Sequence, residues 1–145
     1  MDIISPTITV AIIAASASVI VPAITKYFEH QSLIKKELRE KKIIVYEKII
    51  NLLIGMFYNI KMGEENNTQD LVKKIYDFLP SLISYGSDDV IINFKNWRQN
   101  SVNGNTQDIL LNTENLLVAI RKDLTSKKTK LKSGDILGVF INNHL

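Results

Sequence analysis

The sequence has no cysteine and, among its 145 residues, two histidines, three prolines and six glycines. Without cysteine there is no disulfide framework, no thiolate nucleophile and no zinc–thiolate site, and His30 and His144 are too few for a histidine-rich metal centre. Glycine-rich phosphate loops, the serine elbow of hydrolases and the paired-histidine helix of metalloproteases are also missing. We therefore expect no cofactor, no metal site and no catalytic residues, and we do not expect an enzyme.

The remaining composition is that of one folded chain, with 46% hydrophobic residues, 23% charged residues and a formal net charge of +3. Short alternating patterns typical of β-strands are absent, and apolar residues recur at helical spacing. We expect an all-α protein, in which an N-terminal transmembrane helix is followed by a cytoplasmic helical bundle that oligomerises.

The N-terminus holds an uncharged run of 23 residues between Asp2 and Lys26. At about 1.5 Å per residue, such a helix covers a hydrocarbon core of about 30 Å. A cleaved signal peptide is one alternative, with Ala15-Ser16-Ala17 as the cleavage site, but signal peptides begin with a basic region and this chain begins with an acid. The core helix of a soluble bundle is another. We expect residues 1–26 to form a transmembrane helix.

Basic residues follow this run and none precedes it. Lysine and arginine are retained on the cytoplasmic side of a membrane, so we expect the N-terminus outside and the rest of the chain in the cytoplasm. The residues that decide the orientation are Lys26, Lys35, Lys36, Arg39, Lys41 and Lys42, against Glu29, Glu37 and Glu40.

One narrow stripe of the predicted span carries small or weakly polar residues: Ala11, Ala15, Ser18, Pro22 and Thr25. Small residues allow helices to approach closely in lipid, so the stripe predicts a helix–helix contact, and the lining of a small pore if several copies surround an axis. A simple anchor that happens to contain small residues is the alternative. Because one span cannot form a channel alone, the pore hypothesis requires an oligomer.

Beyond the span, we expect a long linking and core helix over residues 27–62 and a helical bundle over 63–145. Apolar residues surround most of the helix between Ile43 and Ile60, which predicts burial on several sides, in the bundle centre and in an intersubunit seam. Thr68 is expected to cap a helix that breaks at Pro80, with a short piece from Ser81 to Tyr85 after it.

Two more helices and a short last one complete the expected bundle. Ser87 is placed as an N-cap, with Asp88 and Asp89 in the first turn of a helix to about Asn100; capping explains these two carboxylates better than acid–base chemistry. Thr106 starts the next helix, and Ser133-Gly134-Asp135 is expected to cap a short C-terminal helix over 136–141, which needs a docking surface.

Residues 121–132, here called the basic segment, carry six basic residues and one acid, Asp123. Such a cluster predicts binding of a polyanion, with anionic lipid and a solvated loop as alternatives. Trp97 and Arg98 are candidates for a surface on which bases stack, although a lone tryptophan in a small bundle is more often part of the core. The candidate anion-binding residues are Arg121, Lys122, Lys127, Lys128, Lys130 and Lys132.

Three segments behind the N-terminal span resemble a known group: residues 39–47 (REKKIIVYE), 85–88 (YGSD) and 117–124 (LVAIRKDL). With the span, they are similar to small membrane-anchored helical proteins of bacteria, most of all to the transmembrane effectors of Hailong-type anti-phage defence systems. The resemblance covers residues 1 to about 125. It implies an oligomeric channel, taken as a tetramer, that depolarises the inner membrane of an infected cell. It also implies a partner nucleotidyltransferase whose DNA oligomers keep the channel silent.

Two functions of different classes follow. In the first, cytoplasmic helices close an oligomeric membrane channel by binding an anionic ligand. In the second, the chain is a membrane-tethered scaffold without channel activity, which recruits a partner through its apolar C-terminal helix. A soluble helical enzyme is a weaker third.

Overall fold

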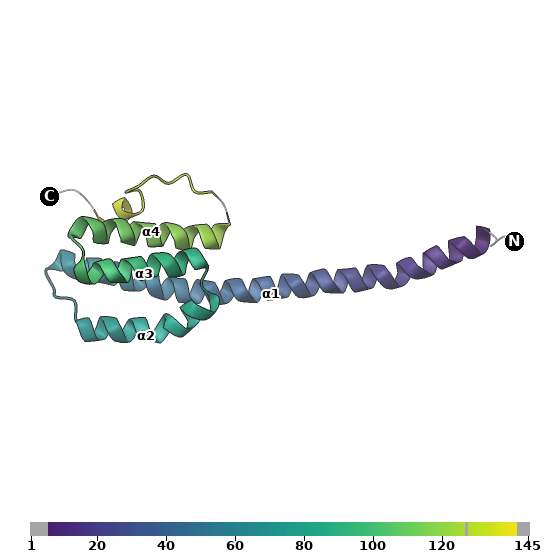
Figure 1. Ribbon diagram of the computed structural model, residues 1–145, viewed down its shortest axis with the longest axis horizontal. Coiled ribbons are helices and arrows are strands. Elements are labelled where there is room, and N and C mark those ends of the chain that lie inside the picture. The colour runs from purple at the N-terminus through teal and green to yellow at the C-terminus, as the bar shows by residue number, and fades with distance from the viewer. Residues whose placement is uncertain (1–5, 127, 142–145) are drawn as a thin grey trace. The chain divides into compact units, whose positions relative to one another are not determined.

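The computed structural model describes residues 6–126 and 128–141, with side chains from Ser18 onward except Val19. Within these residues the chain is helical and has no β-strand, so the prediction of an all-α fold is confirmed. The elements in Figure 1 are α1 (Pro6–Met62), α2 (Thr68–Tyr85), α3 (Asp88–Asn103), α4 (Thr106–Thr125) and a short 3-10 helix, η1 (Leu137–Val139). The chain divides into two compact units, residues 1–38 and 39–145, and α1 contributes to both.

The second unit is a helical bundle with one hydrophobic core. Each of the four α-helices contributes a row of apolar side chains at helical spacing, and α3 lies beside α4 along most of its length (Figure 1). The core consists of Val45, Tyr46, Ile49, Leu52 and Leu53 of α1; Ile75, Phe78 and Leu82 of α2; Val90, Phe94 and Trp97 of α3; and Leu116, Leu117, Ala119 and Ile120 of α4.

The bundle covers one side of α1 and leaves the other open. Ile44, Ile54, Tyr58 and Ile60 are exposed large hydrophobic residues within the run that is expected to be buried on several sides. The first part of that expectation, a position in the bundle core, is confirmed. The second, an intersubunit seam over the same run, stays a prediction.

Helix starts follow local capping chemistry. The Asn67 side chain caps α2 by accepting hydrogen bonds from the backbone N–H groups of Gln69 and Asp70, so the prediction that Thr68 is the cap is wrong by one residue. Ser87 caps α3 as predicted, accepting from the N–H of Val90 at 3.4 Å. Thr106 is the first residue of α4, also as predicted, with Asn105 as its cap.

The predicted break at Pro80 is wrong, because α2 continues through Pro80 to Tyr85. Proline removes one backbone hydrogen bond from a helix interior. Phe78 and Leu82, four residues apart on the buried face, flank this point and are 2% and 1% exposed. Their burial keeps the chain helical, and α2 bends in its second half (Figure 1).

The expected short C-terminal helix over 136–141 is present only as the 3-10 helix η1, and the predicted cap is wrong, because no side chain caps it. The Glu114 carboxylate of α4 accepts the backbone N–H groups of Gly134 and Ile136, and the Asp135 carboxylate accepts the Lys132 N–H. The segment docks on its own chain: Ile136 and Phe140 pack against the core, and the Phe140 ring lies 5.4 Å from that of Phe57.

Candidate functional site

A polar cluster joins three parts of the bundle that are distant in sequence. The Tyr46 hydroxyl donates a hydrogen bond to Asp123 Oδ2 at 2.6 Å and accepts one from the Ser87 backbone N–H at 3.0 Å. Lys42 Nζ lies 2.9 Å from Asp123 Oδ2. We name these four residues the polar clamp. Its members come from the segments 39–47, 85–88 and 117–124, so the stretches that carry the family resemblance meet at one point.

The polar clamp is largely shielded from water. The Tyr46 side chain is fully buried, and the Lys42 and Asp123 side chains are 20% and 17% exposed. Burial and, after it, the hydrogen bond to Asp123 raise the pKa of Tyr46 to about 12. The phenol therefore keeps its proton at neutral pH and remains a donor to the Asp123 carboxylate.

Gly86 places Ser87 within reach of Tyr46. The Gly86 N–H donates to the Leu82 carbonyl at 2.8 Å, which ends α2 tightly. A Cβ at this position would lie 2.6 Å from the Leu82 carbonyl oxygen, closer than real Cβ contacts. Glycine is therefore needed in the turn that presents the Ser87 N–H to α1.

The basic segment starts on α4 and continues into the loop after it. Arg121 and Lys122 lie in the last turns of α4, and Lys128, Lys130 and Lys132 lie in the loop. All five are exposed, and none forms an ion pair within the described part of the chain. Lys127 lies outside the described residues. The segment thus presents cations to solvent, and its one acid, Asp123, belongs to the polar clamp.

Glu114 fixes the far end of this loop. Its buried carboxylate accepts the Gly134 N–H at 2.7 and 2.6 Å and the Ile136 N–H at 3.3 Å. Gly134 adopts a φ of +93°, which favours glycine. The near end is fixed where the Ser126 N–H bonds to the Lys122 carbonyl. The lysine-bearing loop is consequently held to α4 at both ends.

The proposed pore stripe is described in part. Ala11 and Ala15 lie outside the described side chains. Ser18, Pro22 and Thr25 are exposed on α1, and the Thr25 hydroxyl donates to the Val21 carbonyl at 2.9 Å. Their exposure would allow contact with other helices, and that contact stays a prediction.

The base-stacking interpretation of Trp97 is wrong. Trp97 is 3% exposed and packs beside Phe94, with ring centroids 5.7 Å apart, so it belongs to the core. Arg98 is exposed on α3, but Trp97 does not offer a stacking surface beside it.

A cleft of about 640 Å³ lies between α1 and the first turns of α2. It carries three lysines, but Lys48 pairs with Asp77 and Lys74 pairs with Asp70, each at 2.7 Å. Because two of these three cations are paired with acids, the cleft suits a polyanion less well than the basic segment. Among the described residues, no three acidic or histidine side chains lie close enough together to hold a metal ion.

One helix, α1, is long and apolar enough to cross a membrane. The part that meets this test, among described residues, is Ile20–Met62, where the best window has a mean hydropathy of 1.4 and is 28% buried. That range also includes the five core residues that α1 contributes to the bundle. The predicted span over 1–26 lies mostly upstream of it.

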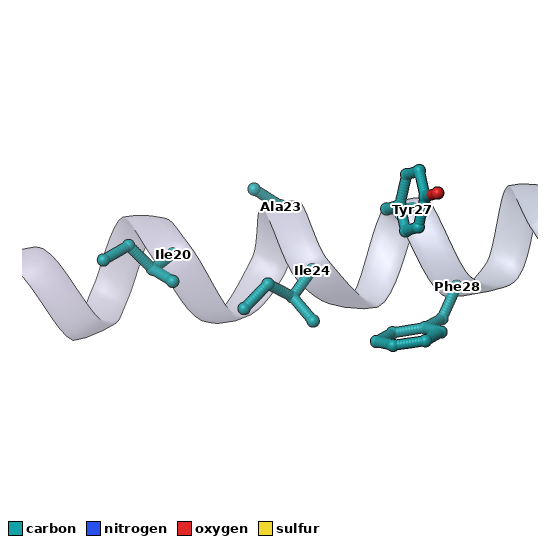
Figure 2. A pocket seen from close by; sticks show the side chains of 5 residues that line it. All are labelled: Ile20, Ala23, Ile24, Tyr27 and Phe28. Carbon is teal, nitrogen blue, oxygen red and sulfur yellow. The ribbon is translucent and has the colours of Figure 1, made fainter.

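Figure 2 shows α1 where the predicted span ends. Ile24 and Phe28 form one row along the helix and Ala23 and Tyr27 another, and together with Ile20 they line a shallow hollow. All five belong to one helix, so no second wall encloses a ligand. This part of α1 presents an apolar surface rather than a small-molecule pocket.

Comparison with known proteins found no matching family model, no matching curated protein and no matching solved structure.

Sequence reasoning identified the cations of the basic segment and missed the residues that hold them in place. Tyr46 is hidden within an apolar run, and Glu114 lies on a helix with no neighbouring clue. Asp123 had a signal, because it is the single acid among six bases.

Proposed function

We propose that the protein is an oligomeric membrane effector of bacterial anti-phage defence: a ligand-gated ion channel that depolarises the inner membrane. The gating ligand is anionic, and a DNA oligomer made by a partner nucleotidyltransferase is the form that the family resemblance suggests. No catalytic step is part of this role. The observation that carries the proposal is the polar clamp, because it ties Asp123 of the basic segment to Lys42 and Tyr46 of α1.

The polar clamp couples ligand binding at the basic segment to helix α1. An anion bound by Lys128, Lys130 and Lys132 would attach to the loop that follows α4. Asp123, near the end of α4, holds two residues of α1. Since α1 is the helix that begins at Pro6, a change at its bundle end has a direct route along one helix. The ligand favours the closed state only to the extent that it binds that state more tightly.

The charge distribution supports a cytoplasmic bundle at the inner membrane. Lys26, Lys35, Lys36 and Arg39 follow the uncharged run, and the N-terminal side carries Asp2 alone. This arrangement is the one that retains the bundle on the cytoplasmic side. There the basic segment would meet nucleic acid made in the cell.

The test is a comparison of two triple variants in bacteria. In the first, Lys128→Gln, Lys130→Gln and Lys132→Gln remove cations of the basic segment. In the second, Lys61→Gln, Lys73→Gln and Lys95→Gln remove three exposed lysines elsewhere in the bundle. The first should lose nuclease-sensitive absorbance at 260 nm on purification in detergent and should depolarise the membrane without infection. The second should behave like the parent.

Two results would overturn the proposal. If a potential-sensitive dye reports no depolarisation from any variant or from the parent during infection, the channel is wrong. If the parent carries no nuclease-sensitive absorbance and both triple variants stay silent, an inhibitory nucleic acid is wrong.

A membrane-tethered scaffold is the second candidate, and an exposed stripe on α2 favours it. Val72, Tyr76 and Ile83 are exposed large hydrophobic residues on one side of this helix. The C-terminal segment suits recruitment less well, since Ile136 and Phe140 pack against the core of their own chain. If an unrelated membrane span in place of residues 1–26 preserves function, the scaffold replaces the channel.

A further inference from the structure

One apolar stripe runs along α1 from the end of the predicted span towards residue 38, and its large side chains are exposed in the described part of the chain. Five of its six residues are large hydrophobic side chains that are between 41% and 61% exposed. They are separated alternately by four and three residues, the spacing of the core positions of a coiled coil. We call this set the α1 seam: Ile20, Ile24, Tyr27, Gln31, Ile34 and Leu38.

Lipid does not account for the exposure of the whole α1 seam. Beyond Lys26 the helix carries Glu29, Lys35, Lys36 and Glu37, which are exposed charged residues. A helix segment with such charges lies in water, where an isolated helix of this length is marginally stable unless its apolar side is covered. The seam stops at Leu38, since the next position of the pattern is the exposed Lys41.

We propose that the α1 seam binds the same seam of a second copy of this chain, in a parallel coiled coil. This inference rests on the proposed oligomeric membrane effector in one respect: copies inserted with the same orientation bring their α1 helices together in parallel. The seam supplies what such an assembly needs, because its residues would face their own counterparts.

Gln31 is the polar member of the seam and sets its register. Its Nε2 donates to the Tyr27 hydroxyl at 3.4 Å, one turn away on the same stripe. A single polar residue at a core position of a coiled coil costs stability but selects one alignment, because polar groups on the two copies meet only when the copies are in register.

Cysteine cross-linking tests the seam directly, since the chain has no cysteine of its own. Tyr27→Cys and Ile34→Cys are introduced separately into the full chain in native membranes and oxidised with copper phenanthroline. Both should give a disulfide-linked dimer several-fold faster than Glu29→Cys and Lys36→Cys. These control positions are also exposed and also seven residues apart, but they lie on the opposite side of the helix.

Each outcome of the cross-linking experiment supports or overturns a part of the proposal. Residues 27 and 34 are about 10 Å apart along the axis, so an antiparallel pair could bring only one of them next to its own copy. Cross-linking at one position alone therefore overturns the parallel arrangement, and no cross-linking, or equal rates at all four positions, overturns the seam. Cross-linking at both positions in membranes that never depolarise would retain the seam and remove the channel. Depolarisation without cross-linking would retain the channel and remove the seam.

Discussion

The Tyr46 hydroxyl is a single group that satisfies two neighbours at once. It donates to Asp123 on α4 and accepts from the Ser87 N–H at the start of α3, while its ring lies in the core. Phenylalanine fills the same space without either hydrogen bond. We expect Tyr46→Phe to lower the free energy of unfolding by about 1–3 kcal/mol, since it leaves the Ser87 N–H unpaired. Thermal unfolding of the full chain in detergent, followed by circular dichroism at 222 nm, measures this.

The pH dependence separates the hydroxyl from general packing. The pKa of Tyr46 is raised from its ordinary 10.0 to about 12, so its contribution to stability is complete below pH 10 and is lost as pH rises towards 12. Tyr46→Phe should remove that part of the alkaline loss. The control is Tyr76→Phe, because Tyr76 is exposed on α2. An equal loss of stability in both variants would contradict the role of the polar clamp.

Helix α2 shows how far local sequence determines an element. Its start was predicted to within one residue from the polar turn before it, whereas its end depends on Leu82, whose burial can be known only from the other helices. Proline does disfavour the interior of a helix, and this is why a break was expected at Pro80. The helix nevertheless continues through that residue. Contacts distant in sequence also decide the structure near the C-terminus. There, the Glu114 carboxylate accepts hydrogen bonds from the Gly134 and Ile136 N–H groups, where a helix cap was expected.

The bend of α2 makes a prediction for the whole element. Pro80 is exposed and lacks the N–H that would bond to the Tyr76 carbonyl. Pro80→Ala should therefore raise the free energy of unfolding, by up to about 3 kcal/mol, which is the helix-interior difference between the two residues. Lys73→Ala, at another exposed site of α2, is the matched control. A loss of stability in Pro80→Ala would instead mean that the bend is needed to bury Phe78 and Leu82 together.

At the scale of the molecule, the sequence predicted the helices and the cations but not how they are connected. Helical spacing identified α1 to α4, and charge counting identified Lys128, Lys130 and Lys132, because both are properties of neighbouring residues. The polar clamp joins residues up to 81 positions apart, so no local pattern contains it. The α1 seam lay between these cases: its spacing is in the sequence, but its significance depends on the exposure of its side chains.

The basic segment and the bundle together predict a salt dependence for binding. Each lysine that contacts a phosphate of single-stranded DNA releases a counterion, and the slope of log affinity against log salt is about −0.7 per contact. With a fluorescein-labelled single-stranded DNA 12-mer and the full chain in detergent, replacing Lys128, Lys130 and Lys132 by glutamine should make the slope shallower by about 2. The triple variant at Lys61, Lys73 and Lys95 should keep the parental slope, although it loses the same net charge. If both variants weaken binding equally and change the slope equally, the chain attracts DNA through its overall charge, and the loop held by Glu114 is not the binding site.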